Sequence, residues 1–264
     1  MKRHHLALWA LLAVAFAIFA IASAFDLPQI GGHQLKSSQI AETIFGDRAD
    51  ADADTSALAL TAPAVADTVA FPVPVDTAAQ TILFIGDSML EGLGPRLAAY
   101  AKKNGHRLYT VIWYSSTSEV WGRSDKLESY IARIRPTFVF VCLGANELFV
   151  NDIKNRRRDY VRKIIADIDT LPYLWIGPPN WKPDTGINEL IAENTPCGAF
   201  FLSDGMHFDR SSDGAHPTRT SAALWMDSVV RWMPAHSFHP IRMELPDRAT
   251  DRADRIFVHQ PDEH

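Results

Sequence analysis

Five short apolar runs, each followed by an amphipathic stretch, constrain the fold of this 264-residue chain more than any other feature. The apolar runs predict strands at residues 81–85, 108–113, 137–143, 173–176 and 199–202. The amphipathic stretches predict helices at about residues 90–103, 125–134, 156–169, 187–194 and 218–232. Strands that alternate with helices form a parallel sheet with helices on both faces. Ligands bind such sheets at the carboxyl ends of the strands, so catalytic residues are expected directly after predicted strands.

The segments on either side of residues 81–243 have a different composition. Residues 25–80 are rich in Ala, Asp, Thr and Pro and include three Ala-Asp repeats at residues 49–54, which predicts a flexible, acidic and Pro-rich spacer. Residues 244–264 are charged and show no periodic pattern, which predicts a disordered charged tail. The chain is therefore expected to hold one catalytic domain, at residues 81–243.

The N-terminal segment, residues 1–24, predicts export. Lys2 and Arg3 precede an apolar run from Leu6 to Ala24 that ends in small residues, as a signal peptide does, and a peptidase could cut after Ala24. The run is also long enough to remain as a membrane anchor, with its basic end in the cytoplasm. Both alternatives predict a domain outside the cytoplasm, periplasmic or at the cell surface, and the second predicts association with the inner membrane through residues 6–24.

Charge and cysteine content exclude two classes of protein. The formal net charge is −5, but most of the acidic excess lies outside residues 81–243, where charges nearly balance, so nothing predicts a nucleic-acid partner. Two cysteines, Cys142 and Cys197, exclude a disulfide framework. Cys142 lies in an apolar run and is expected to be a core residue, and a single disulfide between the two stays open.

Two candidate chemical motifs follow the first and third predicted strands. Ser88, in Gly86-Asp87-Ser88, falls at a strand-to-helix turn, where its hydroxyl would be exposed and its N–H would face a developing oxyanion. The alternative is that Asp87 or Ser88 only caps the helix. Asn146 could donate its side-chain amide to the same oxyanion, while Gly144 would let the backbone approach closely. The alternative for Gly144 and Asn146 is that they only form an ordinary turn.

A third motif, Asp213-Gly214-Ala215-His216-Pro217, follows the fifth predicted strand. A histidine three residues after an aspartate can accept a serine proton while the carboxylate holds its other ring nitrogen. Asp204 and His207 repeat this spacing. The second pair is preferred because Pro217 suits the first turn of the following helix and places His216 at its entrance.

Together the three motifs resemble the first, third and fifth blocks of the SGNH (GDSL-type) hydrolase family, over about residues 81–234. The resemblance implies a flavodoxin-like three-layer α/β/α sandwich with a five-stranded parallel sheet. It also implies that Ser88 is the nucleophile, that the Ser88 N–H and Asn146 stabilise the oxyanion, and that His216 with Asp213 is the base.

The chain departs from the family pattern at two positions. The second block of the family offers a glycine whose N–H completes the oxyanion hole, whereas this chain has Ser115 and Ser116 after its second predicted strand. Either serine could supply that N–H, since a backbone donor needs no particular side chain. Glu147 replaces an aspartate that is frequent at the end of the third block.

Aromatic residues give the only indication of the substrate. Trp121 and Trp181 fall in predicted loops at the catalytic end of the sheet, and aromatic faces in a polar cleft suit sugar rings. With Asp87 they are the predicted substrate-binding residues, and the alternative for both tryptophans is packing in the core.

These inferences predict a serine esterase that needs no metal or organic cofactor and acts on a small-molecule or glycan ester. For an exported member, the family resemblance implies a carbohydrate O-acetyl esterase. Two alternatives stay open: a membrane-anchored polysaccharide O-acetyltransferase that uses the same serine, and a catalytically silent glycan-binding module, motivated by the altered second block.

Overall fold

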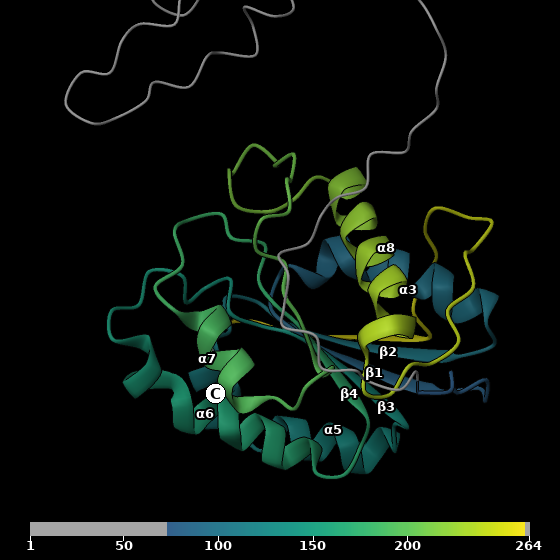
Figure 1. Ribbon diagram of the computed structural model, residues 1–264, viewed down its shortest axis with the longest axis horizontal. Helices are drawn as coiled ribbons and strands as arrows, with labels where there is room; N and C mark the ends of the chain where they lie inside the picture. The colour runs from purple at the N-terminus through teal and green to yellow at the C-terminus, as the bar shows by residue number, and fades with distance from the viewer. Residues whose placement is uncertain (1–72, 262–264) are drawn as a thin grey trace, which may run out of the picture. The chain divides into compact units, whose positions relative to one another are not determined.

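The computed structural model describes residues 73–261, which form a six-stranded sheet with helices on both faces (Figure 1). The strands are β1 (Thr81–Gly86), β2 (Arg107–Trp113), β3 (Phe138–Cys142), β4 (Tyr173–Ile176), β5 (Phe200–Phe201) and β6 (Arg255–His259). The helices are α3 (Leu90–Lys103), α4 (Ser118–Gly122), α5 (Lys126–Ile134), α6 (Ile153–Ile168), α7 (Ile187–Asn194) and α8 (Arg219–His236). The predicted leader or anchor at residues 1–24, and the predicted spacer up to residue 72, lie outside the described residues.

The sheet has the order β5-β4-β3-β1-β2-β6, and all of its neighbouring strands run parallel. Without β6 this is the flavodoxin-like order, in which the chain reverses direction across the sheet between β1 and β3. The predicted fold class is therefore confirmed, while the predicted number of five strands is wrong. Ligand sites in such sheets lie at the reversal point, beside the carboxyl ends of β1 and β3.

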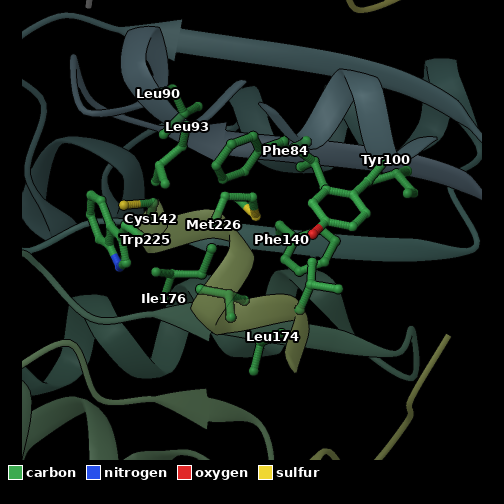
Figure 2. Close-up of a cluster of buried hydrophobic side chains, with 14 of the residues drawn as sticks. Phe84, Leu90, Leu93, Tyr100, Phe140, Cys142, Leu174, Ile176, Trp225 and Met226 are labelled. Atoms are coloured by element: carbon green, nitrogen blue, oxygen red, sulfur yellow. The ribbon is translucent and has the colours of Figure 1, made fainter. Parts of the chain in front are cut away.

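Both faces of the sheet are buried, because alternate residues of each central strand enter different apolar clusters. Ile82 and Phe84 of β1 pack toward α3 and α8, whereas Leu83 and Ile85 pack toward α5, α6 and α7. Figure 2 shows the first cluster, where Trp225 of α8 lies among side chains of the sheet and α3. None of the helices within residues 73–261 is long and apolar enough to cross a bilayer.

A glycine at the end of β1 allows the two central strands to approach at the reversal point. A Cβ atom on Gly86 would lie 2.2 Å from the carbonyl oxygen of Cys142 on β3, which no side chain could tolerate. Gly86 is thus required by the packing of β1 against β3, directly before Asp87 and Ser88. Cys142 is buried, as expected, Cys197 is exposed, and neither forms a disulfide.

Residues 244–261 are part of the domain, so the prediction of a disordered tail is wrong for them. The chain runs back along α3, where Arg96 donates hydrogen bonds to the carbonyl oxygens of Arg248 and Ala249 at 2.9 and 3.2 Å. It then adds β6 beside β2. The N-terminal boundary of the domain also lies before the predicted residue 81, because Asp76 pairs with residues 240–242 through two backbone hydrogen bonds of 2.8 Å. The folded domain therefore begins before Thr81 and extends past Met243.

Candidate active site

Ser88 lies in the turn between β1 and α3, at the reversal point of the sheet. The Asp87 carboxylate makes the turn by accepting a hydrogen bond from the Met89 N–H at 2.9 Å, and the Leu90 N–H donates to the Asp87 carbonyl oxygen at 3.2 Å. Asp87 is buried and Ser88 is only partly exposed. Met89 is the N-cap of α3, which has no side-chain capping bond, so neither Asp87 nor Ser88 caps the helix and the Ser88 hydroxyl is left available for chemistry.

His216 connects Ser88 to Asp213. Its Nε2 atom lies 2.7 Å from Ser88 Oγ, and its Nδ1 atom lies 2.7 Å from Asp213 Oδ2. The second carboxylate oxygen, Oδ1, accepts the backbone N–H groups of Ala215 and His216 at 2.9 and 3.0 Å. These hydrogen bonds lower the pKa of Asp213 to about 2, so the carboxylate is ionised at neutral pH. The three side chains thus have the hydrogen-bond arrangement of a Ser-His-Asp triad.

The loop that carries His216 is held to the rest of the site by Arg210. This guanidinium donates to the carbonyl oxygens of Ala215 at 2.5 Å and Pro179 at 2.8 Å, which joins the loops after β5 and β4. Thr218 caps α8 by accepting the Ser221 N–H at 3.3 Å. Pro217 therefore precedes the cap and does not lie in the first helical turn as predicted. Arg210 was not predicted as a site residue, because no local sequence pattern marks an arginine whose partners are carbonyl oxygens of other loops.

The near-duplicate pair takes no part in the triad. His207 is exposed, and Asp204 accepts hydrogen bonds from Asn180 at 3.0 Å and from the Gly205 N–H at 3.0 Å. Because His216 contacts Ser88, the preference for the second pair agrees with the geometry.

The second-block turn distinguishes its two candidate oxyanion donors. The Ser116 N–H donates to the Trp113 carbonyl oxygen at 3.1 Å, and Ser116 is buried. Ser115 is exposed, and its N–H has no hydrogen-bond partner within residues 73–261. Its φ of 57° is left-handed, a conformation that glycine adopts with less strain. Of the two serines, Ser115 is thus the one whose backbone N–H is not already used in a hydrogen bond within residues 73–261.

Asn146 lies between β1 and the second-block turn. Its amide nitrogen donates to the Ser116 carbonyl oxygen at 3.0 Å and to Asp87 Oδ2 at 3.3 Å. The bond to Asp87 is the longer and therefore the weaker of the two. Burial raises the pKa of Asp87 to about 7, although the Met89 N–H and the nearby His216 partly oppose that effect.

Glu147 fixes the position of α4 from within the core. Its carboxylate is fully buried and accepts hydrogen bonds from the Ser118 N–H at 2.9 Å and the Ser118 hydroxyl at 2.7 Å. Arg157 of α6 pairs with it at 2.8 Å and also with Glu119 at 2.7 Å. These bonds tie the third-block loop to the helix that follows the second-block turn, a structural role for the position where the family often has aspartate.

Several predicted site residues do not line the site as expected. Trp121 belongs to α4, has no exposed surface, and donates its indole N–H to Ser116 Oγ at 3.0 Å, so it supports the second-block turn and cannot contact a substrate. Asp87 is likewise too buried to bind a substrate directly. Gly144 adopts a φ of 121°, and a Cβ there would lie 3.1 to 3.2 Å from Ile187 and Pro178, so its glycine serves packing.

Trp181 does lie at the catalytic end, partly exposed. It donates its indole N–H to the Ala145 carbonyl oxygen at 2.9 Å, next to Asn146. Its ring meets the exposed ring of Phe149 edge-on, with 6.4 Å between centroids. Within residues 73–261, no group of three or more His, Cys, Asp or Glu side chains is arranged to hold a metal ion.

Comparisons with known proteins return only structural likenesses. No family model matches the chain, and no curated protein matches it. The psychrotrophic esterase EstA from Pseudoalteromonas sp. is 19% identical, with 58% of this chain and 98% of that chain covered and a TM-score of 0.42. TesA is 21% identical, with 57% and 96% covered and a TM-score of 0.43.

A lipolytic protein of the G-D-S-L family from Desulfitobacterium hafniense is 12% identical, with 57% of this chain and 98% of that chain covered and a TM-score of 0.41. Likenesses of this size assign no activity to the chain. The case for its chemistry rests on the geometry of Ser88, His216 and Asp213.

Proposed function

We propose that this chain is a serine hydrolase of the SGNH type that cleaves ester bonds. The observation that carries the proposal is the continuous chain of two 2.7 Å contacts from Ser88 Oγ through the His216 ring to Asp213. Ser88 follows β1, whereas Asp213 and His216 lie together in the loop after β5, so the contact between Ser88 and His216 is a property of the fold. A glycan-binding module without catalysis would have no use for this alignment.

In the first half of the reaction, Ser88 Oγ attacks the carbonyl carbon of the ester while His216 Nε2 accepts the hydroxyl proton. The carbonyl oxygen becomes an oxyanion. Donors for it are the Ser88 and Ser115 N–H groups and the Asn146 amide, each of which would contribute a hydrogen bond that strengthens as charge develops. The bond to the alcohol then breaks, and His216 returns the proton to the departing alkoxide.

In the second half, water attacks the acyl group on Ser88, and His216 Nε2 accepts a proton from that water. The tetrahedral intermediate collapses, the acid leaves, and the Ser88 hydroxyl is restored with the proton from His216. Asp213 stays ionised in both halves, because it holds His216 Nδ1–H and stabilises the imidazolium that forms twice.

For the substrate, we propose an O-acetyl group on a carbohydrate outside the cytoplasm. The openness of the site supports a bulky substrate, since the side chain of His216 is 34% exposed and that of Asp213 is 50% exposed. Trp181 and Phe149 offer partly exposed aromatic surface beside Asn146, of the kind that packs against sugar rings. The apolar N-terminal run with its basic start supports export, either by a cleaved leader or by a retained anchor.

Hydrolysis of p-nitrophenyl acetate by the full chain tests the reaction class. Ser88→Ala and His216→Ala should each lose at least a thousandfold in kcat, while Ser228→Ala, which removes a hydroxyl on the exposed side of α8, should stay within twofold. Release of acetate from acetylated xylan then tests the carbohydrate substrate. Hydrolysis that survives in a folded Ser88→Ala protein would refute the proposed nucleophile.

A further inference from the structure

A shallow cavity lies where α4 is joined to α5, outside the triad. Its volume is about 530 Å³. Most of its lining side chains are cationic or aromatic, and the ones that matter here are Arg123, Asp125, Lys126, Tyr130, Arg133 and His259.

The cavity carries an excess of positive charge. Asp125 is the single carboxylate in its lining, against the cations of Arg123, Lys126 and Arg133. Arg123 is compensated by Glu119 at 2.8 Å. Lys126 and Arg133, by contrast, make no ion pair with any carboxylate within residues 73–261.

Aromatic rings hold both uncompensated cations in place. Lys126 Nζ lies 4.9 Å from the ring centroid of Trp113, and the Arg133 guanidinium lies 4.6 Å from that of Tyr130 and 4.5 Å from that of Phe257. A ring attracts a cation through its quadrupole but carries no net charge. The cations are therefore ordered without being neutralised, which prepares them for an anion from solution.

The cavity opens at the same edge of the sheet as the triad. His259 ends β6 and is in register with Trp113, the last residue of β2, which lies directly beside β1. Two strand spacings, about 10 Å in all, separate the carboxyl end of β1 from that of β6. The exposed Ser115 turn follows β2, the strand between β1 and β6, so a ligand that extends from Ser88 across this turn would approach the cavity.

We propose that this cavity binds a negatively charged oxygen group, a carboxylate, sulfate or phosphate, carried by the ester that Ser88 cleaves. The substrate is then an acidic glycan ester or a similar anionic ester. The link to catalysis rests on the proposed function, whereas binding of the anion does not, because the cationic cavity is independent of the triad.

Binding is measured by titration calorimetry on full-length Ser88→Ala, which cannot turn over a substrate. The probes are trigalacturonate, a sulfated disaccharide, inorganic phosphate and neutral maltotriose. The test variant adds Lys126→Gln with Arg133→Gln. The matched control adds Arg156→Gln with Arg252→Gln, two exposed arginines outside the cavity. Circular dichroism confirms the fold of each, and Lys126→Gln alone replaces the pair if the double variant does not fold.

The charged probes should bind more tightly than maltotriose, and the test variant should weaken them about five- to twentyfold, as expected for two partly exposed charges. The control should change affinity less than twofold, and added salt should weaken binding. Phosphate binding as tight as trigalacturonate would assign the site to a free anion and overturn a substrate-borne group. Equal affinities for maltotriose and trigalacturonate, or equal losses in test and control variants, would overturn the cationic site.

The link between anion binding in the cavity and ester cleavage at Ser88 is measured separately. In active protein, the ratio of kcat/KM for an acetylated acidic glycan to that for acetylated xylan should fall at least fivefold in the test variant and stay constant in the control. An unchanged ratio in the test variant, with anion binding lost, would overturn the link to the substrate. Absence of all hydrolysis would contradict the proposed function and leave the calorimetric result standing.

Discussion

Replacing Asp213 by asparagine separates orientation of the base from proton transfer itself. The carboxylate accepts three hydrogen bonds, two from backbone N–H groups to Oδ1 and one from the His216 ring to Oδ2. Asparagine keeps an acceptor for the backbone bonds, so the loop retains its shape. Its amide, however, presents a donor to His216 Nδ1 and favours the tautomer that carries its proton on Nε2, which cannot accept the Ser88 proton.

The expected loss follows from this change of tautomer. A similar substitution in a buried triad costs about 10⁴ in kcat, and Asp213 is half exposed, so water can partly replace it. We expect Asp213→Asn to lower kcat by about a hundredfold to ten-thousandfold and to keep activity measurable above Ser88→Ala. Because the pKa of Asp213 is near 2, the wild-type carboxylate is charged at every pH assayed between 5 and 9.

The assay is the initial rate of p-nitrophenyl acetate hydrolysis under saturating substrate. Asp204→Asn is the matched control, since it makes the same chemical change in the near-duplicate motif, at a carboxylate bonded to Asn180 and not to a histidine. It should change kcat less than twofold. A loss below tenfold in Asp213→Asn, or an equal loss in both variants, would refute the orienting role.

Three further predictions concern the base and the two buried acids. His207→Ala should keep kcat within twofold of wild type in the same ester assay, and a loss as large as that of His216→Ala would mean that the base is misassigned. Glu147→Ala should lower the free energy of unfolding in urea by about 3 to 5 kcal/mol, because it removes one partner of a buried ion pair; a change under 1 kcal/mol would contradict that role. The pKa of Asp87 is near 7 in the folded protein, above its value of 3.8 in the unfolded chain. Between those pH values the native state binds more protons than the unfolded state, so the free energy of unfolding should fall as pH rises from about 4 to 7. Urea unfolding of wild type between pH 4 and 7 should show the free energy of unfolding decrease by at most about 4 kcal/mol, and Asp87→Asn should lack this decrease. Parallel pH profiles of the two proteins would show that Asp87 ionises normally.

The sheet could be predicted where burial leaves a strong pattern. The strands β1 to β4 are mostly apolar, because most residues on both of their faces are buried. At the edge, β6 is only partly covered: Ile256 and Val258 are exposed, and charged residues precede the strand. Its pairing with β2 depends on long-range contacts that periodicity does not encode, so these residues were predicted to belong to a disordered tail.

The site, too, has residues that could be predicted from the sequence and residues that could not. Ser88, Asn146 and His216 could be found because each lies within four residues of the end of a strand or the start of a helix, where the fold must place it. The short helix α4 was not predicted because five residues are too few to show a helical period, so Trp121 was assigned to a loop and predicted to bind substrate, with core packing as the alternative. Which serine of the second block has a free N–H depends on the left-handed backbone at Ser115, a local conformation that a non-glycine residue does not reveal.

The central claim is that Ser88 is a nucleophile activated by His216, and covalent trapping tests it most directly. The full chain is treated with a fluorophosphonate, which loses fluoride as Ser88 Oγ bonds to phosphorus, and the labelled residue is mapped by peptide mass spectrometry. We predict a single adduct on Ser88, none in Ser88→Ala, and labelling at least a hundredfold slower in His216→Ala. An adduct on another residue, or equal labelling rates in wild type and His216→Ala, would contradict the claim.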